Sequence, residues 1–426
     1  MVRRPQRAAG VSASTTPVRP VILGADIGVY ALARAFHEEY GVRSTVIAGA
    51  ALGPIADSAI LDVRLVADGH DPRQLVDELL TVAREHTGGE RLVLLANSDW
   101  LVRVVVQHRA ELEPFYVVPF LSAELLERLS DKASFAEAAV AAGLSVPRTI
   151  VQDFARAGDD DWAPVPVDVG YPLIAKAASS ADYQEVEFPG KAKVFEIADA
   201  DELAALWVSL RDAGFRGRFV VQELIGGDDT RMRSITAYVD SRGSITLLCS
   251  AHVLLEEHTP SGLGNPAAMV VTREQEMLDQ AARFLREVGY VGFANFDVKV
   301  DPRDGSFRFF EVNPRIGRNN YYVTAAGANV ARFLVEDRVL GHAVDPVVVD
   351  GEVLYSILPH RLLLKYVLDP ALAGRVRGLI RSGRVAHPLR YRADAGLKRR
   401  WYAFVAGINQ VRKFRRYYPE VTGTGF

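Results

Sequence analysis

Two apolar runs near residue 300 carry side chains that could bind a cation and act on a phosphate. Asp297 lies in the run 293–300, and Glu311 and Asn313 lie in the run 307–313. Residues rich in Asp, Pro, Gly and Ser separate the runs, which predicts a β-hairpin. Magnesium prefers carboxylate and amide oxygens together with substrate phosphates. The three side chains could therefore form a magnesium site, although acid pairs on hairpins are more often plain surface charges.

The register of this hairpin decides whether the two carboxylates meet. A loop with an odd number of residues centred on Asp304, with Gly305 at positive φ, places Asp297 opposite Glu311. Carboxylates directly opposite each other repel, so solvent, a proton or a cation must separate them. A two-residue turn at Asp304–Gly305 would instead place the acids on opposite faces of the hairpin. Because side chains alternate along a strand, Phe307, Phe309, Glu311 and Asn313 are expected to share one face.

Three basic residues could bind the anionic part of a substrate. Arg315 follows Asn313 and is close enough to stabilise a transferring phosphoryl group or an acyl oxyanion. Lys176 lies inside the apolar run 171–177, where an unpaired charge is costly, so we predict that it contacts an anionic ligand. Arg231 is the third such residue, and an ordinary salt bridge would explain its charge equally well.

The elements before residue 125 predict a small α/β domain. Strand patterns at 21–23, 43–48 and 91–96 alternate with helix patterns at 30–40 and 75–86, which predicts a covered parallel sheet. The turn Gly24–Gly28 lacks the full Gly-x-Gly-x-x-Gly spacing, so a tight turn is favoured over an anion site at a helix N-terminus.

Further along the chain, helix and strand patterns predict a second and larger unit. Ser130 is expected to cap a helix that runs to residue 142, and Thr272 is expected to cap a helix that runs to Val288. The segment 231–252 is expected to form a hairpin. Residues 256–268 contain several Gly and Pro residues and are expected to form a long loop.

Composition limits the class of protein. With 426 residues, 49% apolar and 24% charged, the chain is expected to fold into two to four globular units. One cysteine, Cys249, excludes an internal disulfide framework and fits a reducing compartment. No apolar run reaches the ~18 residues that a membrane span needs. Residues 1–20 are expected to form a disordered tail, although a transit peptide has a similar composition.

Four segments, in order, resemble the ATP-grasp superfamily over roughly residues 129–340. They are Asp131-Lys132 before Gly143-Leu-Ser-Val-Pro147, Tyr171-Pro-Leu-Ile-Ala-Lys176, Val220-Val-Gln-Glu223-Leu-Ile-Gly226 and Glu311-Val-Asn313-Pro-Arg315. The resemblance implies a mixed α/β and α+β protein: a parallel-sheet α/β domain over 21–125, an ATP-grasp domain over 126–345 with lobes at about 126–226 and 227–345, and a basic helical segment over 346–426. Residues 179–193 hold one glycine where many members have a glycine-rich loop, and Lys191 or Lys193 could substitute for that loop by charge.

The resemblance also implies roles for the matching residues. The lysines would contact ATP phosphates, the segment around Glu223 would bind ribose and adenine, and the acidic hairpin would hold one or two Mg²⁺ ions. The implied ATP contacts are Lys132, Lys176, Glu223, Leu224, Ile225 and Arg231, the implied metal ligands are Asp297, Glu311 and Asn313, and the implied catalytic residues are Lys176 and Arg315.

The implied reaction is ATP-dependent amide formation. ATP would phosphorylate a carboxylate, and an amine would attack the resulting acyl phosphate to give an amide, ADP and phosphate. The loop after Glu256 is expected to form a wall of the acceptor site, and Arg315, Arg318 and Asn319 could bind a substrate carboxylate. Within the superfamily, the order of these segments is most similar to the D-aspartate ligase group, whose members join an amino acid to peptidoglycan precursors.

The C-terminal segment is strongly basic. Residues 361–426 contain 15 Lys and Arg and 3 Asp and Glu, whereas the whole chain has a net charge of −3. A cytoplasmic enzyme could use this end to associate with an anionic inner membrane face that presents lipid-linked precursors, and no nucleic acid is expected as a partner. A solvated or packed extension explains the charge equally well. The residues considered for membrane contact are Arg375, Arg377, Arg381, Arg384, the run 398–400, Trp401, Tyr402 and Phe404.

Two other functions are consistent with the sequence. A metabolic ATP-grasp ligase would make a soluble dipeptide, amino-acid conjugate or nucleotide precursor. A nucleotide-regulated binding protein would bind ATP without turnover, although such a protein needs neither both acids nor both lysines.

Overall fold

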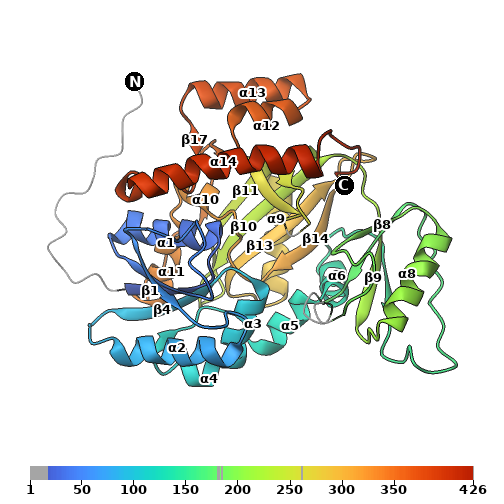
Figure 1. Ribbon diagram of the computed structural model, residues 1–426, viewed down its shortest axis with the longest axis horizontal. Coiled ribbons are helices and arrows are strands. Elements are labelled where there is room, and N and C mark those ends of the chain that lie inside the picture. Colours follow the sequence, from blue (N-terminus) through green and yellow to red (C-terminus); the bar gives the residue numbers. More distant parts are fainter. Residues whose placement is uncertain (1–17, 180–182, 184–185, 261, 426) are drawn as a thin grey trace.

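Three β-sheets and their covering helices organise the chain (Figure 1). The structure is a computed structural model that describes residues 18–179, 183, 186–260 and 262–425. Residues 1–17 of the expected tail lie outside this part. Residues 18–20 do not belong to a tail, because they begin the first strand and Val18 pairs with Arg91.

The N-terminal domain is a five-stranded parallel sheet with strand order β3-β2-β1-β4-β5, which confirms the predicted α/β class. Apolar side chains on both faces of the sheet are buried under helices. Its strands are β1 Val18–Leu23, β2 Ser44–Ala48, β3 Leu61–Leu65, β4 Arg91–Ala96 and β5 Tyr116–Val117, and its helices are α1 Ile27–Tyr40, α2 Pro72–Glu85, α3 Asp99–Gln107 and α4 Arg109–Leu112.

A small lobe follows, built on an antiparallel sheet with order β6-β9-β7-β8. Helix α6 begins at Lys132 because the Asp131 carboxylate accepts a hydrogen bond from the Ser134 N–H. The prediction that Ser130 caps this helix is wrong, since Ser130 ends the preceding helix. The elements are α5 Ala123–Ser130, α6 Lys132–Ala141, β6 Thr149–Asp153, β7 Leu173–Ala177, β8 Phe195–Ile197, α8 Ala200–Asp212 and β9 Arg218–Glu223.

The third sheet has eight strands in the order β14-β13-β10-β11-β12-β16-β17, with β15 paired to β11. The expected loop over residues 256–268 is shorter, because β11 continues to Glu257 and β12 begins at Asn265. Thr272 ends β12 and does not cap the next helix, which starts after Glu274. The elements are β10 Met232–Val239, β11 Ile245–Glu257, β12 Asn265–Thr272, α9 Gln275–Glu287, β13 Gly292–Val300, β14 Phe307–Asn313, α10 Tyr321–Ala325 and α11 Val330–Arg338.

The C-terminal segment joins this third sheet and is not a separate appendage. Its strands extend the sheet beside β11 and β12, and its last helix crosses the molecule from the side of α1 toward the C-terminus (Figure 1). No described helix is long and apolar enough to span a membrane. The elements are β15 Val347–Val348, β16 Leu354–Ser356, α12 His360–Tyr366, α13 Pro370–Arg381, β17 Val385–Ala386 and α14 Leu397–Tyr417.

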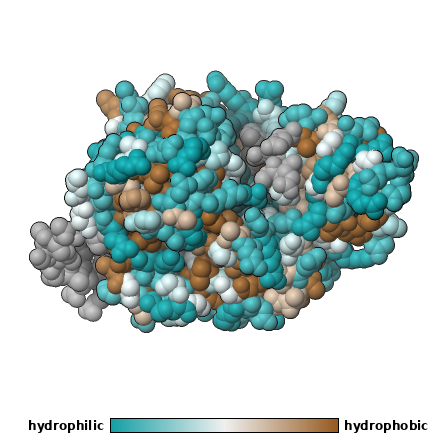
Figure 2. Space-filling model, turned by 90° about the horizontal axis from the view of Figure 1, so that it is seen from below, coloured by the Kyte–Doolittle hydropathy of each residue, from teal (hydrophilic) through white to brown (hydrophobic). Residues whose placement is uncertain are grey.

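The face of the molecule seen from below is mostly hydrophilic, with apolar residues in separate patches (Figure 2). Scattered apolar surface of this kind is normal for a globular protein. The concave surface that could hold a ligand is the cleft between the sheets.

Candidate active site

A cleft of about 900 Å³ collects residues from every part of the described fold. The N-terminal domain contributes the start of α3, the small lobe contributes β7 and β9, and the large sheet contributes β13 and β14. The extreme C-terminal residues Thr424 and Gly425 also reach it. A space of this size accommodates a nucleotide-sized ligand together with part of a second substrate.

The acidic hairpin of β13 and β14 lines this cleft with its carboxylates opposite each other. Asp297 pairs with Glu311 in the strand register, as the odd-loop prediction required. The loop, however, has six residues between the paired Val300 and Phe307. Phe310 is an extra residue, a β-bulge, and this bulge restores the register that brings the acids together.

The bulge also changes which side chains share a face. Phe309 packs in the core against Phe296, with ring centroids 5.9 Å apart, whereas Glu311 and Asn313 line the cleft. The prediction that Phe309 lies on the same face as the acids is therefore wrong, and Phe310 takes the cleft position. A sequence pattern with a strict period of two cannot anticipate an inserted residue.

The two carboxyl groups behave as one coupled unit. Burial and the neighbouring charge of Glu311 raise the pKa of Asp297. Burial would also raise the pKa of Glu311, but the charges of Lys132 and Lys176 outweigh it and lower that pKa. Lys132 Nζ lies 3.9 Å from Glu311 Oε2. A proton or a cation between the two acids would offset their mutual repulsion.

Lys176 occupies the expected position on β7, between apolar neighbours that are buried. Its ammonium lies over the ring of Phe310, 5.7 Å from the centroid. Burial lowers the pKa of Lys176 to about 8, although the negative charge of Glu311 opposes this shift. A bound anion would stabilise the charged form of a partly desolvated ammonium of this kind.

The donor set suits a hard divalent ion. Asp297 and Glu311 supply carboxylate oxygens, and Asn313 is one pleat further along the same strand. Asn313 Nδ2 donates to Asp297 Oδ2 over 3.2 Å, and its oxygen accepts from Arg315. The amide would have to turn over to offer its oxygen to a cation beside Asp297. Among the described residues, no cluster of three His, Cys, Asp or Glu side chains exists that could hold a metal by itself.

The segment after β9 forms the wall where the resemblance implies nucleotide binding. Glu223, Leu224 and Ile225 line the cleft. Glu223 accepts hydrogen bonds from the Arg148 N–H and from Arg303, each at 3.0 Å. Arg303 belongs to the turn of the acidic hairpin, so the two walls are connected directly.

Arg231 is the exception among the predicted ligand contacts. It is exposed at the end of a short 3-10 turn and does not belong to the described lining of the cleft. The geometry favours the salt-bridge or solvated alternative over a phosphate contact.

Arg315 and Arg318 connect the site to the N-terminal domain. Arg315 Nε lies 2.8 Å from Asp99 Oδ1, and Arg318 bridges Asp26 and Glu257 at 3.2 Å and 2.7 Å. Asp26 also caps α1 by accepting from the N–H groups of Gly28 and Val29. The Gly24–Gly28 turn is thus a tight capped turn, as the sequence favoured, and the carboxylate of Asp26 occupies the helix N-terminus that an anion would need.

Several residues around the cleft were not among the predicted site residues. Asn295 and Lys299 alternate with Asp297 on β13 and therefore share its face, a signal that the period of two contains. A second group could not be found from spacing: Asp229 accepts from the Glu256 N–H and from His258, each at 2.8 Å. Burial raises the pKa of Glu256 to about 8, with Asp229 adding to the shift.

The architecture and the cleft resemble known proteins. A family model described as "Carbamoyl-phosphate synthase L chain, ATP binding domain" matches residues 131–331. The fold is similar to that of N5-carboxyaminoimidazole synthetase from Staphylococcus aureus complexed with ADP, with a TM-score of 0.56, 15% identity and coverage of 82% of this chain and 84% of that one. It is also similar to that of L-amino acid ligase from Bacillus licheniformis, with a TM-score of 0.51, 14% identity and coverage of 78% and 76%. The fold is therefore that of ATP-grasp enzymes.

A curated relative narrows this class. D-aspartate ligase from Enterococcus faecium (strain Aus0004) is 30% identical over 407 residues, which cover 94% of this chain and 96% of that protein. D-alanine–D-alanine ligase from Pseudomonas putida (strain GB-1) is 26% identical over 49% of this chain and 62% of that one. The chain belongs to the D-aspartate ligase family, and it is an ATP-dependent carboxylate–amine ligase.

Proposed function

We propose that this enzyme uses ATP and Mg²⁺ to join the side-chain carboxylate of D-aspartate to an amine of a peptidoglycan precursor. We choose D-aspartate because the Enterococcus relative carries it in its name, and that relative matches over almost its whole length. The observation that carries the chemistry is the opposed pair Asp297 and Glu311, which shares one cleft with Lys132 and Lys176.

In this proposal each wall of the cleft has a task. Lys132 and Lys176 bind the phosphates as they move, and the segment Glu223–Ile225 binds ribose and adenine. Asp297, Glu311 and a turned Asn313 would hold one or two Mg²⁺ ions, which offset charge on the phosphates when bound. Arg315 stabilises the oxyanion at the acyl carbon, and Asp99 keeps its guanidinium in place.

The reaction then has two displacements. A carboxylate oxygen attacks the γ-phosphorus, the bond to the β-phosphate oxygen breaks, and ADP leaves. The amine nitrogen next attacks the acyl carbon, the C–O bond to phosphate breaks, and the amine loses a proton. Neither step needs a covalent enzyme intermediate.

The amine acceptor distinguishes this proposal from a metabolic ligase. A coupled assay should measure ADP release with ATP, Mg²⁺ and D-aspartate, and with L-aspartate in its place, against free amino acids and against precursor peptides that carry a free side-chain amine. We expect ADP release with D-aspartate and the precursor peptides. Turnover with free amino acids alone would support the soluble-conjugate alternative instead, and ATP binding without turnover on any pair would support a binding protein.

Substitution of Glu311 tests the site itself. Glu311→Gln removes the carboxylate that Lys132 and the proposed cation require, so we expect ADP release to fall by at least about a hundredfold. Asp304→Asn is the matched control, because Asp304 is exposed in the turn of the same hairpin and contacts Ser306 and Arg308. Near-normal turnover in Glu311→Gln would exclude the assigned metal and phosphate site.

We also propose that the enzyme works at the cytoplasmic membrane face, where lipid-linked precursors are exposed. The support is the charge of the C-terminal segment, because an anionic surface attracts a cluster of Lys and Arg.

A further inference from the structure

Helix α14 carries a row of exposed apolar side chains on its outer face. Leu397, Trp401, Phe404 and Ile408 recur at intervals of four, three and four, so they lie on one stripe of the helix. Their exposed fractions are 84%, 66%, 59% and 38%. These four residues form the apolar ridge of α14. Exposed apolar surface arranged in one row normally marks a contact site.

The opposite face of α14 is occupied by the protein. Arg399 donates to the backbone oxygens of residues 53, 54 and 56, and Phe414 packs near Tyr366 and His258. Tyr402 is half-buried where it meets the backbone near Gly53. The packed-extension explanation is therefore correct for this inner face, and Tyr402 does not belong to the outer contact surface. The apolar ridge has no such cover among the described residues.

The charge on α14 has a single sign. The helix contains seven Lys and Arg and no acidic residue. Arg399 faces Asp394 and Lys398 pairs with Asp57, whereas no ion pair is found for Arg400, Arg412 or Arg415 within the described residues. Two of the arginines considered from sequence belong elsewhere, because Arg375 and Arg384 both pair with Glu352.

We propose that the apolar ridge of α14 docks on an anionic lipid surface. This inference deepens the proposed function, because it names the surface that would bring the enzyme to its acceptor. A helix with aromatic residues on one stripe and Lys and Arg beside it lies in a membrane interface, with its apolar face in the headgroup region and its charges on anionic lipids. A second copy of the chain fits less well, since two helices that carry seven positive charges each would repel.

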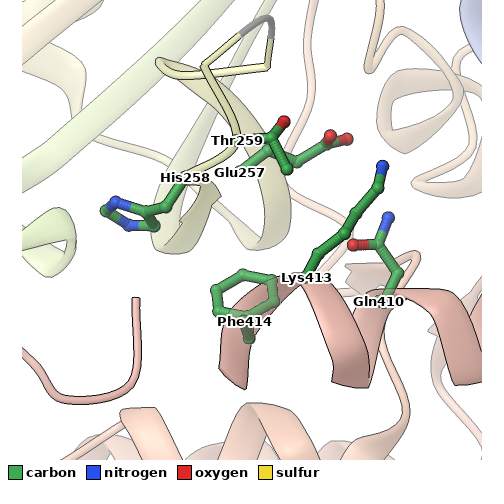
Figure 3. A pocket seen from close by; sticks show the side chains of 6 residues that line it. All are labelled: Glu257, His258, Thr259, Gln410, Lys413 and Phe414. Atoms are coloured by element: carbon green, nitrogen blue, oxygen red, sulfur yellow. The ribbon is translucent and has the colours of Figure 1, made fainter. Parts of the chain in front are cut away.

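The C-terminal part of α14 contacts the segment that leads into the cleft. Gln410 and Lys413 lie on the inner face of α14 and point toward the segment 257–259 (Figure 3). Together with Phe414, these residues line one small pocket. The ring of His258 stacks on Tyr418 directly after α14, with centroids 3.5 Å apart. The strand end that carries Glu257 and His258 leads into the cleft wall, so α14 is attached to the active site itself.

Vesicle sedimentation of the full chain tests the inference without any substrate. We expect binding to vesicles of phosphatidylglycerol and phosphatidylethanolamine, and little binding to vesicles of phosphatidylcholine alone. Rising salt should weaken binding, because part of the attraction is electrostatic. Trp401→Glu and Phe404→Glu should each lower the binding constant at least about tenfold.

Val208→Glu is the matched control, since Val208 is 48% exposed on α8 of the small lobe. It should bind vesicles as the wild type does. Trp401→Glu should keep its ADP release with soluble substrates, which shows that the variant is folded. If no substrate pair supports turnover, the proposed function fails, while the vesicle result still decides the docking.

Three outcomes would overturn the inference. Equal binding of wild type and Trp401→Glu to anionic vesicles would remove the ridge from the contact. A dimer in solution that Trp401→Glu converts to a monomer would assign the ridge to a second copy. Tighter binding to duplex DNA than to anionic vesicles would assign the positive charge to nucleic acid.

Discussion

At the scale of single residues, the proposed site contains charged groups that are unfavourable without a ligand of opposite charge. Lys176 lies partly desolvated in a β-strand, and Asp297 and Glu311 lie opposite each other on a second sheet. Removing a charge from water is costly unless an opposite charge compensates it. ATP phosphates and the proposed divalent cation would supply the missing charges, so the arrangement would favour the bound state over the free one.

Lys176→Met tests this conflict between function and stability. The substitution keeps the unbranched shape and removes the buried charge, so we expect ADP release to fall by at least about a hundredfold. The melting temperature of the ligand-free protein should stay the same or rise, because the desolvation cost disappears. Calorimetry of the two proteins without ATP measures the second effect. A clear drop in melting temperature would mean that Lys176 stabilises the fold.

At the scale of elements, close contacts between segments distant in the sequence and a bulge within one hairpin position the side chains of the proposed site. The bulge at Phe310 brings Glu311 opposite Asp297, and the start of α1 contacts the segment that follows β14, because Asn320 donates to the Gly28 carbonyl. A Cβ atom at Gly28 would lie 2.3 Å from Asn97 Nδ2 and 2.8 Å from the Arg318 backbone. The glycine therefore allows α1 to approach the segment that holds Arg315 and Arg318.

Gly28→Ala should separate these two elements. Because the Arg318 backbone must move, we expect the free energy of unfolding to fall by about 1–3 kcal/mol and ligase turnover to fall with it. Chemical denaturation and the ADP assay measure the two effects.

Gly374→Ala is the control, since a Cβ there meets nothing within 4 Å and Gly374 lies in α13. It should be neutral or stabilise by up to about 1 kcal/mol. Equal effects of the two substitutions would contradict the close-packing argument.

At the scale of the whole molecule, the C-terminal segment connects the N-terminal domain to the large sheet. Arg34 on α1 donates to the backbone oxygens of residues 387, 388 and 390, and Tyr30 donates to Asp394. The His387 ring lies in this connection, and its Nδ1 accepts from the Leu389 N–H over 3.2 Å. Burial lowers the pKa of His387 to about 3, and nearby Arg390, Arg34 and His360 add to the shift.

This connection should weaken in acid. His387 is neutral in the folded protein, whereas the unfolded chain binds a proton below a pKa of about 6.5. The stability from neutral His387 is therefore complete above pH 6.5 and is lost as the pH falls toward 3. His387→Asn keeps an acceptor for the Leu389 N–H but does not titrate. Thermal unfolding between pH 7 and pH 5 should show a smaller loss in His387→Asn than in wild type, and equal losses would contradict the assignment.

The sequence by itself determined the class of fold and most of the proposed site. Alternating strands and helices predicted the parallel N-terminal sheet. The position of Lys176 within an apolar run led to the prediction that it contacts an anionic ligand. Both signals are local. Asn295 and Lys299 could also have been found, since they alternate with Asp297 on one strand. Cap positions were less certain: Asp131 and Ser130 are both good caps, and only the backbone path selects one.

The tertiary structure decided what depends on contacts between distant residues. It alone revealed the bulge at Phe310 and the grouping of Asp229, Glu256 and His258. It also showed that Arg231 lies outside the described lining of the cleft. It also showed that α14 has one packed face and one exposed ridge. Composition alone indicated only that the segment is basic. The physical reason is that spacing fixes only which side of its own element a side chain occupies, whereas the partner on that side is set by how sheets and helices pack.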